Sequence, residues 1–330
     1  MSDISYSNML EMLKDCLSEV QKSAARMKVP GISSGFGNLD GLMCGFEPGK
    51  VYVIGARPGM GKMAFVLSMI RGITLGDKVP VLLFSTNHMK ASYIYKLLSI
   101  HCGVSTLQLQ KGWMKPQEWG ILDDEAFELV KAPFFIHDSL DLPLGELVET
   151  AHHCISEKGI KIIFIDCLQM IDFANADGTP SERVAKVMSA LKQLACETKI
   201  PVVVGAMMNR RVEHREGIDG KRPQLGDLAN SCYIEELADV VMMVHRPEYY
   251  KIFEDERGRN LRGLMEIIVM KNDLRPSGSV FLDYQHETGL VSQKDATIAS
   301  RPVPQIDFRM RNKTVKKLIK TFGLEEDMPF

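Results

Sequence analysis

The stretch GARPGMGKMAF, residues 55–65, follows the apolar run VYVI and leads into a helical pattern. It fits the phosphate-binding frame G-x-x-x-x-G-K-[ST] at Gly61 and Lys62, with Ala56 in place of the first glycine. Met63 stands where the frame has a serine or threonine hydroxyl that binds Mg²⁺. A thioether is a poor ligand for a hard cation. The stretch therefore predicts a strand–loop–helix unit for phosphate with a defective metal position; a purely structural glycine turn is the alternative.

Bulk composition allows an ordinary globular protein of one large domain or two smaller ones. The chain has 330 residues, of which 45% are hydrophobic and 25% charged. The formal net charge is −2, so the overall balance predicts no polyanion partner and any nucleic-acid site must be a local basic patch.

The cysteines and the N-terminal segment predict where in the cell the protein is located. Seven cysteines, an odd number without a C-x-x-C spacing, indicate reduced thiols and no zinc site or disulfide framework. The start MSDISYSNML has no basic segment followed by an apolar core, and no run of about 18 apolar residues occurs. We therefore expect a cytoplasmic protein without a membrane span.

Apolar runs alternate with helix-like segments through most of the chain. This alternation predicts an α/β fold with a mostly parallel sheet and helices on both faces. The last runs lie close together and predict a meander at one sheet edge. The runs are VYVIGA at 51, VPVLLFS at 79, PFFIH at 133, KIIFID at 161, IPVVVGA at 200, DVVMMVH at 239, LMEIIVMK at 264 and SVFLDY at 279.

Three segments are expected: residues 1–29, 30–293 and 294–330. Residues 8–27 carry apolar side chains at helical spacing, which predicts an amphipathic helix before the main domain. The tail after 293 is basic and then acidic, which favours a solvated helix or disordered end; a basic contact for nucleic acid or a partner is the alternative.

The nucleotide site is expected to combine the loop with Asp166. KIIFID ends in this aspartate after four apolar residues, where a carboxylate beside Mg²⁺ sits in such folds. A helix N-cap or surface turn is the alternative role. The loop N–H groups and the helix dipole would bind phosphate. The candidate nucleotide-binding residues are Ala56, Arg57, Pro58, Gly59, Met60, Gly61, Lys62 and Met63.

Several segments together resemble the C-terminal motor domain of the DnaB-type replicative helicases, a RecA-like ATPase. They occur in the family's order over about residues 30–293, and the A-R-P opening of the loop is shared. The resemblance implies a RecA-like P-loop NTPase fold, ATP or ADP with Mg²⁺ as ligands, single-stranded DNA as a partner, and a role in DNA replication. The segments are GISSGFGNLDGLMCGFEPGKVYVIGARPGMGKMAF, KIIFIDCLQMI, IPVVVGA, KRPQLGDL and IEELADVVMMVHRPEYY.

The resemblance also bears on assembly. The family's N-terminal primase-contacting domain is expected to be absent. Residues 8–27 resemble the family's linker helix, which docks on the neighbouring subunit of a ring. This implies a homo-oligomer or a helicase-family partner; packing of the helix on its own domain is the alternative.

The family's hydrolysis residues transfer only in part. Asp166 matches the Mg²⁺-water aspartate, but Asn87 replaces the glutamate that polarises the attacking water. Met207 replaces the glutamine that senses the γ-phosphate. Lys271 is kept, while Asp273 stands at the position of the arginine finger.

The magnitudes of these losses predict weak or lost hydrolysis. An arginine finger is worth about 10³ to 10⁵ in rate, and a general base roughly 10² to 10⁴. Arg275 is an alternative finger in a different register, and His88 an alternative base, although a neighbouring strand-end residue points the other way. Nucleotide binding without Mg²⁺ and an unused loop both stay open. A non-hydrolysing scaffold or regulatory protein is the alternative function.

The DNA-facing loops also depart from the family. After KRP…D the family has an arginine, a glutamate and a glycine that hold the strand; here Ala229, Asn230 and Cys232 occupy the loop. Residues 173–183 are expected to form a second pore-facing loop with one arginine and one aromatic side chain. A solvated basic face is the alternative to phosphate contact. The candidate DNA contacts are Arg210, Arg211, Lys221, Arg222 and Asn230, with Arg215 nearby.

Overall fold

A computed structural model of the chain describes residues 30–86, 89–172, 178–273 and 275–293. The described residues from 31 to 293 belong to one compact unit. The helix expected over 8–27, the tail expected over 294–330, and Asn87 and His88 lie outside the described residues, as does 173–177 of the second expected loop.

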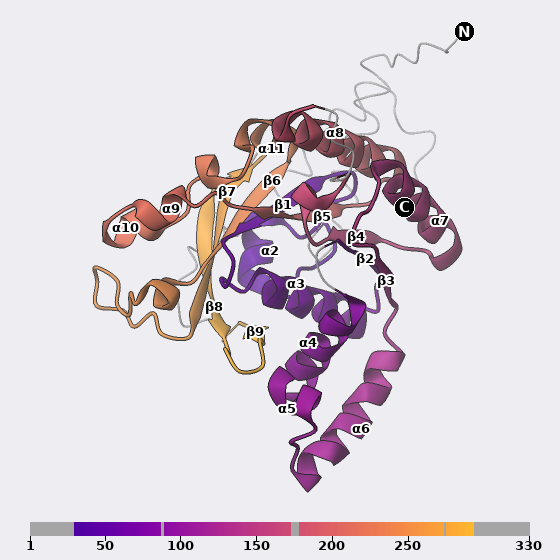
Figure 1. Ribbon diagram of the computed structural model, residues 1–330, viewed down its shortest axis with the longest axis vertical. Helices are drawn as coiled ribbons and strands as arrows, with labels where there is room; N and C mark the ends of the chain where they lie inside the picture. The colour runs from indigo at the N-terminus through magenta and orange to yellow at the C-terminus, as the bar shows by residue number, and fades with distance from the viewer. Residues whose placement is uncertain (1–29, 87–88, 173–177, 274, 294–330) are drawn as a thin grey trace, which may run out of the picture. The chain divides into compact units, whose positions relative to one another are not determined.

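The described residues contain one nine-stranded sheet with the order β3-β2-β4-β5-β1-β6-β7-β8-β9. In this order, the strands β3, β2, β4, β5, β1 and β6 pair in parallel. Strands β7, β8 and β9 follow β6 as antiparallel neighbours. The predicted mostly parallel sheet with an edge meander is therefore confirmed (Figure 1). The strands are β1 (Val51–Ala56), β2 (Val81–Ser85), β3 (Phe134–Asp138), β4 (Ile162–Ile165), β5 (Val202–Met207), β6 (Val240–His245), β7 (Leu264–Asn272), β8 (Gly278–Tyr284) and β9 (Val291–Ser292).

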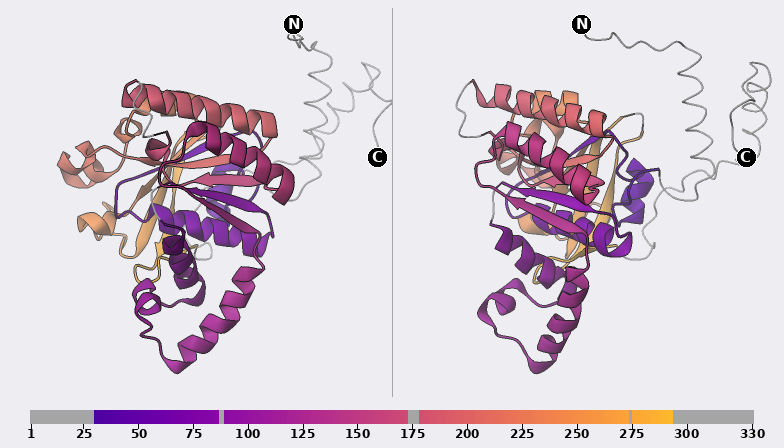
Figure 2. Two further views of the ribbon diagram at one scale, coloured as in Figure 1. Left: turned by 45° about the vertical axis from the view of Figure 1, so that its right-hand side comes forward. Right: turned by 90° about the vertical axis from the view of Figure 1, so that its right-hand side faces the viewer.

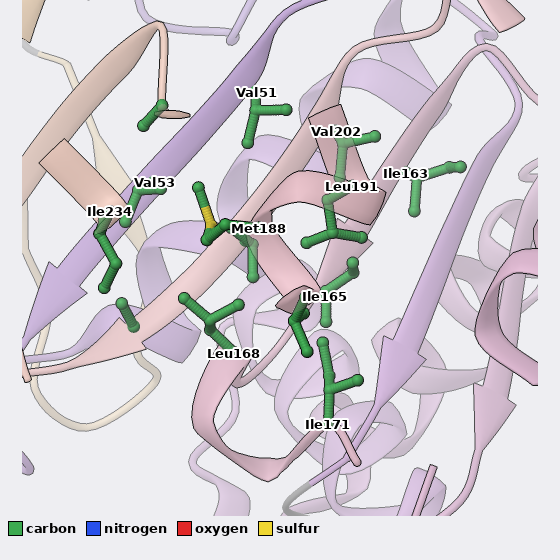
Figure 3. Packing of buried hydrophobic residues seen from close by; sticks show 14 of the residues in the cluster. Val51, Val53, Ile163, Ile165, Leu168, Ile171, Met188, Leu191, Val202 and Ile234 are labelled. Atoms are coloured by element: carbon green, nitrogen blue, oxygen red, sulfur yellow. The ribbon is translucent and has the colours of Figure 1, made fainter. Parts of the chain in front are cut away.

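Helices cover both faces of this sheet, as predicted. Alternate side chains of β1 enter different cores: Val51 and Val53 pack with α7, α8 and α11, and Tyr52 and Ile54 pack with α2, α3 and α4. Figure 3 shows the first of these cores. The strands read as continuous apolar runs because both of their faces are buried. These helices are α2 (Gly37–Met43), α3 (Lys62–Arg71), α4 (Lys90–Cys102), α7 (Leu144–Lys158), α8 (Pro180–Thr198) and α11 (Ser231–Leu237).

Helix α8 shows how local sequence fixes an element of the first core. Thr179 is its N-cap and forms a capping box with Glu182, and Pro180 occupies the first helical position. Its apolar residues recur at helical spacing and are buried against the sheet (Figure 3). They are Val184, Val187, Met188, Leu191, Leu194 and Ala195.

Helices α5 (Thr106–Lys111) and α6 (Pro116–Val130) form an extension beyond α4 (Figures 1 and 2). No residue of α6 is fully buried, and large apolar side chains of this extension are exposed. Among the described helices, none is both long and apolar enough to cross a bilayer. The remaining helical segments of the described residues are short: η1 (Gly72–Gly76), η2 (Leu168–Met170), α9 (Arg211–His214), α10 (Gly217–Lys221), η3 (Leu225–Asp227) and η4 (Pro247–Tyr250).

Candidate nucleotide-binding site

Residues 55–65 form the predicted strand–loop–helix unit. Strand β1 ends at Ala56, and α3 begins at Lys62 with Gly61 as its N-cap. Gly59 and Gly61 have φ of 82° and 88°, which side chains of other residues rarely tolerate. The loop therefore presents N–H groups and the positive end of α3 to a single place, which suits an anion.

Lys62 reaches from the loop to the end of β4. Its Nζ donates a hydrogen bond of 2.8 Å to the backbone oxygen of Asp166 and lies 3.6 Å from the Oδ1 of that residue. Gly205 on β5 permits this approach, because a Cβ there would lie 2.1 Å from the Asp166 oxygen and 2.8 Å from Nζ. The loop lysine and Asp166 therefore lie side by side at the ends of neighbouring elements.

The second carboxylate oxygen of Asp166 is also occupied. The hydroxyl of Tyr93 on α4 donates a hydrogen bond of 2.5 Å to Oδ2, and both residues are buried. Burial raises the pKa of Tyr93, and the charge of Asp166 raises it further. The phenol therefore stays protonated as a donor at physiological pH.

A second lysine enters the site from the same helix. The Nζ of Lys96 lies 3.1 Å from the Sδ of Met63, which accepts its hydrogen bond. The Lys96 residue is half-buried; burial lowers the pKa of this amine, and the negative charge of Asp166 opposes that shift. The position that the loop frame assigns to a metal-binding hydroxyl thus holds a sulfur next to an ammonium group.

These groups line a cleft of about 540 Å³, within the size range of ligand pockets. Met207 reaches it from the end of β5, with 38% of the residue exposed. Met60 does not line the cleft, because its side chain packs in the core beneath the loop. The sequence-predicted residues that the cleft brings together are Ala56, Arg57, Pro58, Gly59, Gly61, Lys62, Met63, Asp166 and Met207.

The side chain of Arg57 binds Glu213 and Met208, which come much later in the sequence. Its Nε and Nη2 donate to Oε1 of Glu213 at 2.9 and 2.6 Å, and its Nη1 donates to the carbonyl of Met208 at 2.9 Å. The guanidinium of this loop arginine is therefore bound to α9 and to the residue that follows β5.

The residues present do not fit Mg²⁺. This hard cation prefers carboxylate, hydroxyl and water oxygens. Met63 offers only sulfur, Lys96 brings a positive charge to it, and both oxygens of the Asp166 carboxylate already have partners. Within the described part of the chain, no group of three His, Cys, Asp or Glu side chains is arranged to hold a metal.

Lys271, Asp273 and Arg275 lie at the edge of the sheet where the parallel strands begin, opposite the edge where they end at the cleft. Asn272 pairs with Val240, which aligns with Tyr52 at the start of β1, whereas the loop follows the far end of that strand. Four strand residues, about 13 Å, separate the two edges. These side chains are therefore remote from the cleft of the same chain.

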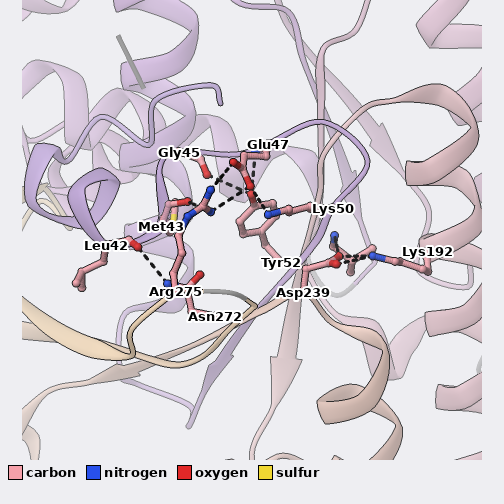
Figure 4. A network of polar contacts seen from close by, with 11 residues as sticks. Leu42, Met43, Gly45, Glu47, Lys50, Tyr52, Lys192, Asp239, Asn272 and Arg275 are labelled. Atoms are coloured by element: carbon pink, nitrogen blue, oxygen red, sulfur yellow. Dashed lines mark hydrogen bonds and ion pairs between the residues drawn. The ribbon is translucent and has the colours of Figure 1, made fainter. Parts of the chain in front are cut away.

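The side chains at this edge already have partners (Figure 4). Arg275 Nη2 donates to Glu47 Oε1 at 2.6 Å, and its Nη1 donates to the other carboxylate oxygen and to the Met43 carbonyl. Burial raises the pKa of Glu47, but Arg275 and Lys50 outweigh burial and the net shift is downward. A role for Arg275 as an arginine finger, which stays a prediction, would require breaking this two-point contact.

Lys271 contributes to the structure of this edge. Its Nζ donates to the carbonyl oxygens of Glu235 and Ala238 at 2.8 and 2.6 Å, and lies 3.6 Å from Asp273. A lysine at these positions satisfies carbonyls that the end of α11 leaves unpaired.

Some of the candidate DNA contacts bind other residues of the chain, and others are exposed to solvent. Arg222 pairs with Glu266 at 2.7 Å, and Lys221 donates to the backbone of Glu213. Asn230 accepts a hydrogen bond from Ser181 at 3.0 Å. Arg210 and Arg211 are exposed near the start of α9.

Arg215 is also engaged and lies 2.5 Å from a carboxylate oxygen of buried Asp227. Ala229, in the loop that follows Asp227, has a backbone N–H that donates to Met207.

Sequence reasoning missed Tyr93 and Lys96. A signal was present, because Tyr93, Lys96 and Ile100 follow the i, i+3, i+7 spacing of a buried helix face, and a lysine on such a face is unusual. The contact of Glu213 with Arg57 joins residues 156 positions apart and had no such signal.

The sheet, the loop before α3 and the aspartate after β4 define a protein with the RecA-like P-loop fold. The chain belongs to the DnaB-like helicase C terminal domain family, whose model matches residues 31–292. The predicted family resemblance and fold are therefore confirmed.

Relatives and solved structures agree with this assignment. The chain is 34% identical over 256 residues to a replicative DNA helicase DnaB of Treponema pallidum, covering 77% of this chain and 54% of that protein. It is 30% identical over 277 residues to a probable replicative DNA helicase of Trieres chinensis, covering 83% of this chain and 60% of that protein. The chain thus spans somewhat more than half the length of these relatives.

A solved structure of an isolated ATPase domain superposes with a TM-score of 0.79 and 25% identity, covering 88% of this chain and 100% of that domain. A DnaB-like replicative helicase, described with its interactions with primase, gives a TM-score of 0.77 at 25% identity, over 89% of this chain and 69% of its own.

Proposed function

We propose that this chain is a helicase-family P-loop protein that binds ATP or ADP and hydrolyses ATP weakly or not at all. The observation that carries the proposal is the pairing of an intact anion cradle with an altered metal position. Gly59, Gly61 and Lys62 keep the geometry that suits phosphate, while Met63 and Lys96 occupy the metal side of the cleft. We therefore expect the chain to bind nucleotide but to hydrolyse ATP weakly or not at all.

Equilibrium binding tests the first half of this proposal. Fluorescent ATP and ADP analogues titrated into the full chain are expected to bind, and Lys62→Ala is expected to abolish that binding. Lys90→Ala, an exposed lysine at the start of α4, is the matched control and should bind like the unaltered chain. Equal affinity of the unaltered chain and Lys62→Ala would contradict use of the loop.

Single-stranded DNA is proposed as a second ligand in the setting of DNA replication. Arg210 and Arg211 are exposed beside the cleft-lining end of β5, and exposed arginines can contact phosphates without reading sequence. Anisotropy of a labelled oligothymidylate should fall in the Arg210→Ala/Arg211→Ala variant, with a shallower salt dependence. A Lys111→Ala/Lys131→Ala variant on α5 and after α6 supplies the control for lost charge.

Assembly through residues 8–27, with copies of this chain or a helicase-family partner, completes the proposal. A scaffold or regulatory role toward a replication partner is the second candidate function. Both draw support from the exposed apolar side chains of the extension, since such a surface is typical of an interaction site. These side chains include Leu107, Trp113, Trp119, Ile121, Phe127 and Val130.

Light scattering distinguishes these possibilities. Deleting residues 1–27 is expected to reduce an oligomer to a monomer, and Trp119→Ser/Phe127→Ser should have the same effect if the extension receives the helix. An unchanged mass in both variants would contradict assembly through this segment. The cytoplasmic location stays a proposal supported by the cysteine pattern.

A further inference from the structure

We propose that the ammonium group of Lys96 takes the place of Mg²⁺, so that this cleft binds the phosphate groups of a metal-free nucleotide. The inference rests on the nucleotide binding proposed above and specifies the form of the ligand. It follows from the position of Lys96, from its hydrogen bonding and from the charge of the site.

The position of Lys96 is that of a counter-cation. Its Nζ contacts the side chain of Met63, directly after Lys62, where the P-loop frame puts the hydroxyl beside the metal. Lys96 and Lys62 line the same cleft from different helices, α4 and α3. A phosphate chain on the loop would therefore meet one ammonium from each helix.

The hydrogen bonding of Lys96 leaves it able to bind an anion. An ammonium group has three donors, and within the described residues the hydrogen bond of Lys96 goes to a thioether, a weak acceptor. Phosphate oxygens are much stronger acceptors and form charge-assisted bonds with ammonium groups. The phosphate oxygens of a ligand would thus give the Lys96 ammonium stronger hydrogen-bond acceptors than the Met63 sulfur does.

The charge of the site disfavours a metal-loaded nucleotide. The negative charge of Asp166 is already matched by Lys62 at 3.6 Å and by the hydroxyl of Tyr93. A magnesium ion on the β and γ phosphates would approach the Lys96 ammonium without gaining a hydroxyl ligand from Met63. Chelation of the nucleotide by Mg²⁺ should therefore compete with binding to the protein.

Calorimetric titration of the full chain tests this inference, with ATP, ADP and inorganic pyrophosphate measured separately in EDTA and in excess Mg²⁺. We expect ATP and ADP to bind in EDTA at least as tightly as in Mg²⁺. Lys96→Gln should weaken binding in EDTA about tenfold or more, Lys96→Arg should retain most of it, and Lys90→Gln should change nothing. Thermal unfolding of each variant verifies that it is folded.

The outcomes separate the two proposals. Tighter nucleotide binding in Mg²⁺ with no effect of Lys96→Gln would overturn the role of Lys96 and leave nucleotide binding intact. Lys96-dependent binding of pyrophosphate alone would support Lys96 and overturn the nucleotide as ligand. Absence of binding by all three probes would overturn both. Met63→Thr/Lys96→Gln should reverse the preference toward Mg²⁺; a preference unchanged by that exchange would also overturn the role of Lys96.

Discussion

The hydroxyl of Tyr93 donates a hydrogen bond of 2.5 Å to Oδ2 of Asp166, the carboxylate that follows β4. The bond joins α4 to the end of a central strand and is buried. It leaves Asp166 held by a phenol on one oxygen and by Lys62 on the other. The aspartate thus stabilises the walls of the cleft in the free protein.

Tyr93→Phe should lower the free energy of unfolding, because a hydrogen bond to a charged, buried group is lost. We expect a loss of about 1.5–3 kcal/mol, measured by urea denaturation. Tyr95→Phe, an exposed tyrosine on the same helix, should change it by less than about 0.5 kcal/mol. Equal midpoints for Tyr93→Phe and the unaltered chain would show that the bond contributes nothing.

Glu213→Gln should strengthen nucleotide binding several-fold, because it weakens the ion pair that engages Arg57 and makes this cleft-lining guanidinium available to a phosphate. Titration with the fluorescent ATP analogue measures the effect. Glu216→Gln removes a charge from the same exposed region and serves as the control. Weaker binding in Glu213→Gln would mean that the pair organises the loop rather than restraining it.

His245 should make the protein less stable as the pH falls from about 6.5 to about 4. Burial lowers its pKa from 6.5 to about 4, although the charge of Glu266 acts in the opposite direction and Arg222 adds to the lowering. Between these values the unfolded chain binds the proton and the folded chain does not. The stabilisation is complete above pH 6.5 and lost toward pH 4, by up to about 3 kcal/mol.

The measurement is urea denaturation across pH 4–7 for the unaltered chain and His245→Phe, which keeps a ring against Tyr250. Titration of other groups affects both proteins, so the difference between the two curves isolates His245. A constant difference would contradict the assigned shift.

Leu191→Ala should destabilise the core beneath α8 by about 2–5 kcal/mol, since Leu191 is fully buried and its truncation leaves a cavity (Figure 3). Gln193→Ala, two residues further along the helix, should change stability by less than about 0.5 kcal/mol. Chemical denaturation of both variants provides the comparison, and a small effect of Leu191→Ala would mean that the core collapses around the site.

The sequence contained most of what determines the sheet. Runs such as VYVIGA and IPVVVGA become β1 and β5 because a strand buried on both faces needs apolar residues throughout. The loop from Gly59 to Lys62 was also predictable, because its conformation restricts which residues can form it.

Tertiary contacts account for what was missed. Glu213 binds Arg57 across 156 positions, and Lys96 reaches Met63 from a different helix, so neither contact is recorded in local spacing. Lys271 and Asp273 are remote from the cleft because β7 runs antiparallel to β6, and this strand direction also depends on tertiary pairing. Asn87 lies outside the described residues, and its role stays a prediction.

The rate of ATP hydrolysis tests the central claim most directly: a cleft that holds phosphate has lost the groups that cleave it. Phosphate release is measured for the full chain in Mg²⁺, with and without single-stranded DNA, beside Lys62→Ala and Met63→Thr/Asn87→Glu. We predict that the unaltered chain and Lys62→Ala release phosphate at the same background rate and that DNA adds nothing. Turnover that DNA stimulates and Lys62→Ala abolishes would contradict the account.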